Sequence, residues 1–505
     1  MRYIFAVSFL LLFANLTNAQ IVGPVPEGNV NSIYQNGISN MDAYGDTLWI
    51  GPLLQRHIGK QIDWYTADKA DSVTNGQGRL YSIALGRDTV IAGLGYTKDV
   101  SGSATDVGMG YYTSVDGGNN WNFISLPLES KDDTVYHYGA NNIKTLPVVV
   151  PEQSPPYDVA FHGNTIFSVN WASGVIRSTD FGKNWNRLIL PPTSVDSLNP
   201  NNTYNFGFDP RNDNNFLGFG LLIDKSGYVW VGTADGVNIS PNALAAPRDS
   251  VIWYHKQAST SIDGLMSNWI ITIKQQPGTN RVWLTNWVVN GNEQYGVVST
   301  TDHGKTFKHH LAGEKIYNLA FHDSTIFATG DSGLFISKDN GKTWNHIAQI
   351  KSPNTFIKAN ALYYATARTT NRFWVGTSDG LASTIDNGKT WDITRVNLPL
   401  KGGNRFQKDA PNVNCYAYPN PYSRSEHGIV RIKFKVPNSG NVSIKLYDFG
   451  MNLIRVLDNK YLSSGTHEAV WDGLDAHGHR VANGVVFYRI KTPNHKYGGK
   501  ILVLQ

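Results

Sequence analysis

One eight-residue pattern occurs five times in this chain, and its clearest copy reads Ser337-Lys338-Asp339-Asn340-Gly341-Lys342-Thr343-Trp344. The aspartate carboxylate can accept hydrogen bonds from the backbone N–H groups that follow it, the glycine can adopt a positive φ, and the aromatic ring can be buried against the next strand. We therefore interpret each copy as a turn between two β-strands, with a structural aspartate whose oxygens are already occupied. The aspartate, glycine and aromatic residues of the five copies are Asp116, Gly118 and Trp121; Asp180, Gly182 and Trp185; Asp302, Gly304 and Phe307; Asp339, Gly341 and Trp344; and Asp386, Gly388 and Trp391.

Seven short apolar strands, each entered by a turn, give the number of repeats. Five of them lead into the pattern, the fourth leads into a degenerate copy at residues 236–240, and the first has no copy. The interval from Asp180 to Asp302 is about twice that from Asp116 to Asp180, which leaves room for one more repeat whose turn has lost the pattern. We predict an all-β protein in which residues 20–400 form a seven-bladed β-propeller. The seven strands lie at residues 47–51, 89–93, 165–168, 228–232, 281–284, 325–328 and 372–376.

Composition agrees with a folded protein rich in turns, since 41% of the residues are hydrophobic, 16% are charged and 49 are glycine. The net charge of +5 comes from 44 basic and 39 acidic residues that form no basic run, so no nucleic-acid partner is predicted. Cys415 is the only cysteine, which excludes an intrachain disulfide, a haem-attachment motif, a cysteine-based zinc site and an iron–sulfur cluster. We predict no cofactor and no metal site.

The first residues have the features of an export signal. Arg2 precedes an apolar stretch from Ile4 to Ala14, and Thr17 and Ala19 form a small-x-small cleavage pattern. We predict a cleaved signal peptide at residues 1–19, no transmembrane segment after cleavage, and a protein that is extracellular or on the outer-membrane surface.

The repeated pattern resembles the Asp box of the sialidase-like superfamily, also known as the BNR repeat, which lies between the third and fourth strands of a propeller blade. In those families the turns lie away from the ligand face. The resemblance does not extend to sialidase chemistry, because the Arg-Ile-Pro signature is absent and the early arginines are scattered. The seven-bladed photosystem stability factor type, known for assembly roles, has a similar repeat pattern.

Xyloglucan-type endoglucanases of the same superfamily use two aspartates in a cleft between two propellers, whereas this chain has residues for only one. An acid/base pair could come from the loop carboxylates, but their spacing selects no two of them, so the catalytic residues stay unknown. The loop carboxylates considered are Asp63, Asp106, Asp263 and Glu293.

Residues 416–505 have a different sequence pattern, with six short strands of alternating hydrophobicity at the spacing of an immunoglobulin-like sandwich. We predict that residues 401–415 form a linker before it. The motifs Tyr418-Pro419-Asn420-Pro421 and Trp471-Asp472-Gly473 and the segment 483–488 resemble the FlgD-type Ig-like domain. That domain is similar to the C-terminal sorting domains of the type IX secretion system. The resemblance implies that residues 416–505 engage an outer-membrane secretion machinery in a Bacteroidetes-like cell, before release or surface attachment.

Four tryptophans near predicted strand ends are candidates for a ligand face: Trp64, Trp171, Trp269 and Trp287. The alternative is that they pack between blades. The sequence thus favours a secreted or cell-surface, non-catalytic binding or scaffold propeller with a polysaccharide or protein ligand. A secreted carbohydrate-active enzyme, either a glycoside hydrolase or a polysaccharide lyase acting in the propeller funnel, is the alternative.

Overall fold

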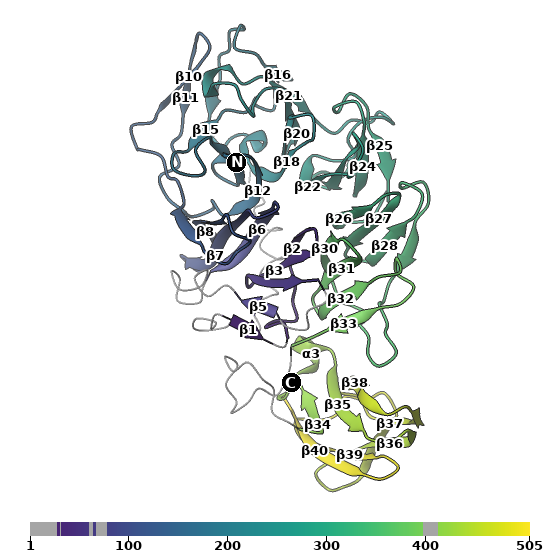
Figure 1. The fold of residues 1–505 in the computed structure, drawn as a ribbon. Coiled ribbons are helices and arrows are strands. Elements are labelled where there is room, and N and C mark those ends of the chain that lie inside the picture. Colours follow the sequence, from purple (N-terminus) through teal and green to yellow (C-terminus); the bar gives the residue numbers. More distant parts are fainter. Residues whose placement is uncertain (1–27, 31, 60–63, 67–77, 397–412, 505) are drawn as a thin grey trace. The chain divides into compact units, whose positions relative to one another are not determined.

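The computed structural model describes residues 28–30, 32–59, 64–66, 78–396 and 413–504 (Figure 1). The predicted signal peptide and residues 401–412 of the predicted linker lie outside this part. The chain divides into two compact units, one formed by residues 1–349 and 359–395 and the other by residues 350–358 and 396–505.

The first unit is built from seven antiparallel sheets that follow one another along the chain. Blades 2 and 3 have four strands each, while blade 1 gains β1 beside β5 and blade 4 gains β16 beside β21. The strands of blades 1 to 4 are β2 (Asn40–Tyr44), β3 (Thr47–Gly51), β4 (Gln55–Ile58), β5 (Trp64–Thr66) and β1 (Gly28–Val30); β6 (Arg79–Leu85), β7 (Val90–Val100), β8 (Ser103–Ser114) and β9 (Asn122–Ser125); β12 (Pro156–His162), β13 (Thr165–Asn170), β14 (Gly174–Ser178) and β15 (Asn186–Leu188); and β18 (Gly218–Ile223), β19 (Val229–Thr233), β20 (Gly236–Ser240), β21 (Trp253–Lys256) and β16 (Ser197–Leu198).

Blades 5 to 7 have four strands each, so the predicted all-β fold and seven-bladed propeller are confirmed. Their strands are β22 (Trp269–Gln275), β23 (Val282–Trp287), β24 (Gly296–Thr300) and β25 (Lys308–His310); β26 (Ile316–His322), β27 (Thr325–Gly330), β28 (Gly333–Ser337) and β29 (Asn345–Ile347); and β30 (Tyr363–Thr369), β31 (Arg372–Thr377), β32 (Gly380–Thr384) and β33 (Asp392–Thr394).

The first strand of each blade lies innermost, and these seven strands form a closed ring. Each contacts the first strand of the next blade, and β30 of blade 7 contacts β2 of blade 1 (Figure 1). Residues before β2 complete the closure, because the Ile38 N–H donates to the Thr377 carbonyl at 2.9 Å and the Gly380 N–H donates to the Asn36 carbonyl at 2.7 Å. Closure leaves no blade with an unpaired neighbour in the ring.

Two insertions that depart from the repeat, the first between β9 and β12 and the second between β15 and β18, pack on each other beside blades 3 and 4. β10 (Val135–Tyr138) and β11 (Asn141–Thr145) form a hairpin, and β11 pairs in parallel with β17 (Gly207–Phe208). Two short 3₁₀ helices, η2 (Asn214–Phe216) and η3 (Arg248–Ser250), complete this region. Its core includes the stacked rings of Phe208 and Phe216, whose centroids are 4.1 Å apart.

Each copy of the repeated pattern forms a hydrogen-bonded turn after the third strand of its blade. In blade 2, Asp116 Oδ1 accepts from the backbone N–H groups of Asn119 at 3.0 Å and Asn120 at 2.8 Å, and the Gly118 N–H donates to Ser114 Oγ at 2.9 Å. Hydrogen bonds from the backbone and side chain of Asn120 lower the pKa of Asp116 to about 2. In blade 4, Asn242 takes the aspartate's place, because Ser240 Oγ donates to its Oδ1 at 3.2 Å.

The glycine of each turn touches the preceding blade. Gly118 has φ +85°, and a Cβ there would collide with the indole ring of Trp49 in blade 1. The same holds in blade 6, where a Cβ on Gly341 would lie 2.6 Å from Cη2 of Trp283 in blade 5. The glycine is therefore needed both for its backbone conformation and for the close approach of two blades.

The second unit is a sandwich of two antiparallel sheets around one core that contains Trp471 and Tyr422. A four-residue helix, α3 (Arg424–His427), precedes β35. The immunoglobulin-like identity of this sandwich and its sorting role stay predictions. One sheet has the order β34 (Cys415–Tyr418), β35 (Val430–Val436) and β38 (Gly465–Trp471), and the other has β37 (Leu453–Leu462), β36 (Gly440–Tyr447), β39 (Gly484–Lys491) and β40 (Lys496–Val503).

Replacing Gly118 with alanine should destabilise the propeller strongly. We expect roughly 1–2 kcal/mol from the positive φ and a further loss of about 1–3 kcal/mol from crowding Trp49. Gly117→Ala is the matched control, because Gly117 also has a positive φ, +71°, but a Cβ there meets nothing within 4 Å. Urea unfolding followed by tryptophan fluorescence measures both, and equal losses for the two variants would contradict this account of the blade contact.

Candidate functional site

The inner strands share an irregularity that turns aromatic side chains toward the propeller axis. In six of the seven inner strands the pairing with the second strand shifts near the strand's start. Such a bulge re-aims the side chain of the extra residue. The residues between the paired positions are Tyr81, Tyr157, Phe219, Ile271 with Thr272, Tyr317 and Tyr364.

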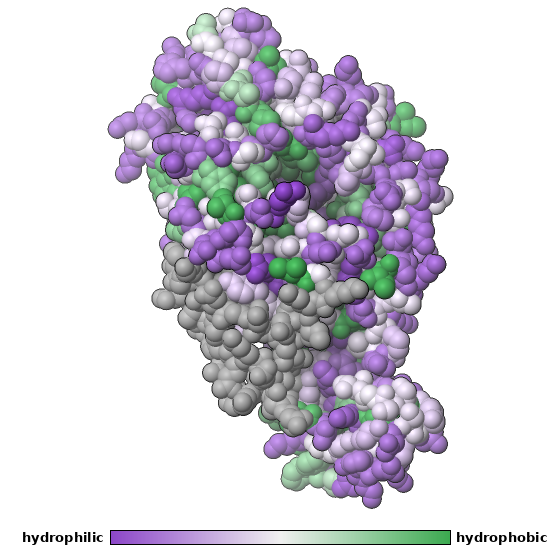
Figure 2. Space-filling model, viewed as in Figure 1, coloured by the Kyte–Doolittle hydropathy of each residue, from purple (hydrophilic) through white to green (hydrophobic). Residues whose placement is uncertain are grey.

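These residues line one cavity of about 150 Å³, which we call the axial channel. Every blade contributes to it, since blade 1 adds Asn40 and Met41 and blade 5 adds Lys274 and Trp287. Blade 1 has no bulge in its inner strand and supplies a small polar residue where most other blades supply a ring. Figure 2 shows the propeller hollowed near its centre, with apolar residues, in green, beside the hollow.

The aromatic rings that line the channel form two contacting series, and we call them the crown: Tyr81, Tyr157, Phe219, Trp287, Tyr317 and Tyr364. On one side the centroids of Tyr81 and Tyr157 are 6.1 Å apart and those of Tyr157 and Phe219 are 6.0 Å apart. On the other side Tyr317 lies 5.2 Å from Trp287 and 5.9 Å from Tyr364. Six of the sixteen residues that line the channel are aromatic, and a ligand group in the channel would meet ring faces and edges on both sides.

Three of the four tryptophans proposed from the sequence gather at one end of the channel. Trp171 and Trp269 both pack on Phe219, at centroid distances of 5.2 and 5.3 Å, and lie 6.4 Å from each other. Trp287 lines the channel itself. The structure places Trp64 elsewhere, because its side chain is only 3% exposed in the core shared by blades 1 and 7, with Trp374 at 6.3 Å.

These tryptophans and the repeated turns lie at opposite ends of the blades. Trp171 directly follows a second strand, Trp287 ends one, and Trp269 begins a first strand, whereas the repeated turns follow third strands. Since neighbouring strands in a blade are antiparallel, the two groups lie on opposite faces of the ring. We call the face with the tryptophans the channel face.

Two carboxylates at the channel face hold tyrosine hydroxyls of the crown. The Tyr81 hydroxyl donates to Asp106 Oδ1 at 2.9 Å, and Thr97 Oγ1 donates to the same oxygen at 3.2 Å. The Tyr317 hydroxyl donates to Asp331 Oδ1. Burial raises the pKa of Asp106 above its ordinary value. These carboxylates fix the rings and give the channel face acidic groups.

Asp158 and Asp42 lie on the inner strands, and each accepts two backbone hydrogen bonds. Asp158 accepts from its neighbour Val159 and, at 2.9 Å, from Leu221 N–H in the next blade. Asp42 likewise accepts from its neighbour and, at 3.1 Å, from Leu85 N–H in the next blade. Both carboxylates therefore act as clamps between blades.

Lys274 lines the channel and counteracts the effect of burial on these acids. Burial raises the pKa of Asp158 to about 7, with the Lys274 ammonium opposing the rise and Asp42 adding to it. Burial raises the pKa of Asp42 too, again against Lys274. In the part of the chain that the structure describes, no carboxylate lies within ion-pair distance of Lys274, so its ammonium group is available to the channel.

Three of the four loop carboxylates named from the sequence accept hydrogen bonds from neighbouring protein groups. Asp106 accepts from Tyr81, Asp263 accepts from Ser261 Oγ, and Glu293 accepts from the backbone of Val289 and Asn290. Asp63 lies outside the described residues. Within those residues no group of three or more His, Cys, Asp or Glu side chains could hold a metal ion, and no helix is long and apolar enough to cross a membrane.

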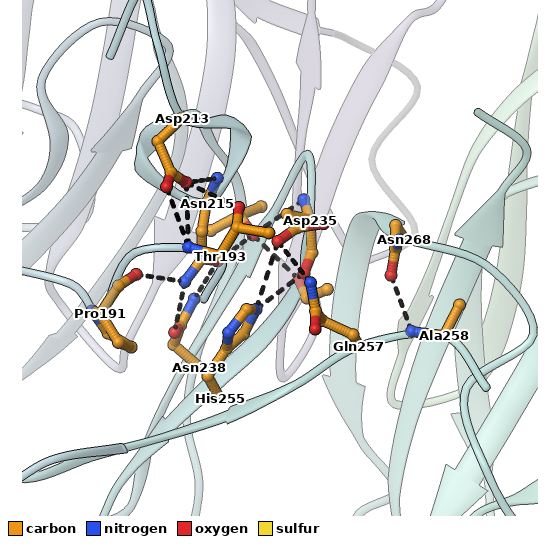
Figure 3. Close-up of polar contacts among 12 residues, drawn as sticks. Pro191, Thr193, Asp213, Asn215, Asp235, Asn238, His255, Gln257, Ala258 and Asn268 are labelled. Atoms are coloured by element: carbon orange, nitrogen blue, oxygen red, sulfur yellow. Dashed lines mark hydrogen bonds and ion pairs between the residues drawn. The ribbon is translucent and has the colours of Figure 1, made fainter. Parts of the chain in front are cut away.

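A buried polar network lies beside the channel face, and Figure 3 shows its hydrogen bonds. Asp235, in the turn after β19, accepts from Gln257 Nε2 at 2.8 Å, and its carbonyl oxygen lies 2.8 Å from His255 Nε2. Asn215 from the second insertion bonds to Asn238 in β20 at 3.0 Å. The neighbour of Asp235, Ala234, packs in the cluster that holds Trp171 and Trp269, so the network positions that turn against the tryptophans.

Sequence reasoning missed the aromatic crown and this network. The crown did leave a signal, because Tyr157-Asp158-Val159-Ala160-Phe161 and Tyr317-Asn318-Leu319-Ala320-Phe321 are two copies of one motif. The network left none, since its members come from an insertion, a strand turn and a blade edge that the fold alone brings together.

Comparison with known proteins gives one short family match. The model described as the BNR/Asp-box repeat matches residues 335–346, which contain the repeated turn of blade 6. No curated protein sequence matches this chain. Together with the sheet topology, the match supports a BNR-type propeller.

Several solved structures are similar in fold at low identity. YCF48 from Cyanidioschyzon merolae is 17% identical with a TM-score of 0.43, covering 71% of this chain and 97% of that one. PorZ, a surface component of the type IX secretion system of Porphyromonas gingivalis, is 14% identical with a TM-score of 0.36, covering 93% and 75%. The GH74 enzyme of Niastella koreensis is 10% identical with a TM-score of 0.45, covering 96% and 74%.

The raised pKa of Asp158 predicts a pH-dependent stability. The folded state binds this proton more tightly than the unfolded chain, in which the aspartate pKa is 3.8. The folded state therefore loses stability as pH rises from about 4 to about 7, and this loss is complete above about pH 7. Asp158→Asn should make this slope shallower and leave the smaller contribution of Asp42, whereas Asp263→Asn in an exposed loop should keep the slope unchanged. Urea unfolding across this pH range tests the assignment, and an unchanged slope in Asp158→Asn would refute it.

Proposed function

We propose that this chain is an exported, non-catalytic binding propeller that recognises a polypeptide through its channel face. The observation that carries the proposal is the axial channel, with its aromatic wall and the tryptophans at its mouth. A rigid disc with a concave aromatic centre suits recognition by anchoring one group of a partner and contacting its neighbours at the rim.

The size of the channel favours a polypeptide side chain or chain end over an oligosaccharide. Pockets that bury whole small ligands measure about 300–1,000 Å³. The axial channel holds about 150 Å³, enough for one side chain inserted between the rings. The ammonium group of Lys274, which lines the channel, then offers a charged hydrogen-bond donor to the polar atoms of that segment.

The state of the carboxylates argues against the glycoside hydrolase alternative. Hydrolysis needs two carboxyl groups free to act on the glycosidic bond from either side. Asp158 and Asp42 are each tied to backbone N–H groups of two blades, and Asp106 is tied to Tyr81. In the described residues, the acids near the channel are thus used for structure.

Export belongs to the same proposal. The signal peptide at residues 1–19 would start it, and residues 416–505 would engage an outer-membrane secretion machinery and leave the propeller released or at the cell surface. The separate core of the second unit, built around Trp471, supports a module that acts independently of the propeller.

A combined screen tests this function. The full chain is offered a displayed peptide library and a panel of polysaccharides, with retention and released reducing ends measured in the same wells. We expect peptide retention, no released sugar, and about 30-fold weaker peptide binding for Trp171→Ala, as for an aromatic anchor of an interface. Tyr254→Ala, an exposed aromatic on β21, should leave binding unchanged. Released sugar would overturn the proposal, and so would equal losses in the two variants.

A further inference from the structure

The positive charge of the chain is concentrated in its C-terminal unit. Residues 413–505 contain twelve Lys and Arg against six Asp and Glu, whereas the whole chain has a net charge of only +5. The remainder of the chain is therefore close to neutral. Such an asymmetry indicates an anionic partner for the basic part.

Much of this charge lies on one surface, the outer face of the sheet formed by β37, β36, β39 and β40. The alternate residues Val442, Ile444 and Leu446 of β36 are buried in the core, so Lys445 and Tyr447 face outward. Lys445 lies opposite Arg489, Lys491 opposite Lys496, and Phe487 opposite Lys500. We call this surface the basic face, defined by Lys445, Arg489, Lys491, Lys496 and Lys500.

Apolar side chains border the basic face at one edge. Leu453 pairs with Tyr447 and is 53% exposed, and Val456 pairs with Lys445. Phe449, in the turn between β36 and β37, is 81% exposed. Arg489 lies over the ring of Tyr447, 5.5 Å from its centroid. Cations and exposed hydrophobic groups thus share one surface.

Acidic groups do not neutralise this surface. In the described sheet, the outward positions of β36, β39 and β40 carry no Asp or Glu. Asp448, in the adjoining turn, accepts hydrogen bonds from Asn452 N at 2.8 Å and Nδ2 at 3.0 Å, and Asp458 is paired with Lys460 at 3.1 Å. The cations of the basic face are free to meet an external anion.

We infer that the basic face docks this chain on an anionic lipid surface. Lysine and arginine ammonium and guanidinium groups would meet the headgroup phosphates, while Phe449 and Leu453 would enter the apolar layer beneath. A surface that combines cations with neighbouring exposed hydrophobic groups suits a bilayer interface. A protein interface, by contrast, is depleted of lysine at its core. The inference is independent of the proposed function of the channel.

Vesicle co-sedimentation of the full chain tests the inference. We expect binding to vesicles of phosphatidylglycerol and phosphatidylcholine, little binding to pure phosphatidylcholine, and weaker binding as salt rises. The double variant Lys445→Gln with Arg489→Gln should weaken vesicle binding roughly 25-fold, because each cation near an anionic surface raises the affinity about fivefold. Phe449→Ser should weaken it further without changing the salt dependence.

The control places the same charge change on the other sheet. Lys433→Gln with Lys435→Gln alters β35, and we expect vesicle binding to stay within a factor of two of the wild type, which the basic-face account requires. Equal losses in the two double variants would overturn the inference, as would equal binding to neutral vesicles. A third outcome is that the chain binds poly-glutamate beads but not vesicles, and that Lys445→Gln with Arg489→Gln abolishes the bead binding. That outcome would assign the basic face to an acidic protein and would overturn the inference too.

Discussion

Closure of the ring is the constraint on which the propeller depends. The segment before β2 hydrogen-bonds to blade 7, and Ser32 Oγ donates to the Arg395 carbonyl at 2.6 Å. Without these contacts, blades 1 and 7 would each present an uncovered face to water. Because every inner strand is held by two neighbours, the bulges near the strand starts can point bulky rings at the axis and still remain ordered. The axial channel is thus a consequence of closure.

The two faces of the disc differ in structure, and the proposed recognition belongs to only one of them. On one face the repeated turns use their aspartates and glycines to join strands and to let consecutive blades approach, as Gly118 does against Trp49. On the other face, the strand ends do not follow the repeated pattern, and they carry the insertions, the tryptophans and the network around Asp235. The carboxylates of the inner strands belong to the structural group, because Asp158 and Asp42 tie blades together through backbone N–H groups.

The sequence predicted the fold well because the repeat is local. An aspartate, a glycine and an aromatic residue within eight positions specify a turn by short-range hydrogen bonds, and the strand before it shows by its alternation. The channel was predicted only in part. Trp171, Trp269 and Trp287 were named and come to one end of the ring, but Trp64 packs between blades, since exposure depends on neighbours from distant segments. Tyr157 and Tyr317 escaped notice because a bulge, which sequence alternation does not show, turns them inward.

Hydrogen exchange of the full chain with and without a bound peptide tests the central claim most directly, namely that recognition occurs at the channel face. The account predicts slower exchange at the starts of β12, β18 and β26 and in the turn at Trp171, with no change in the turns of Asp116, Asp180 and Asp339. Protection confined to those turns, with none at the inner strands, would contradict it.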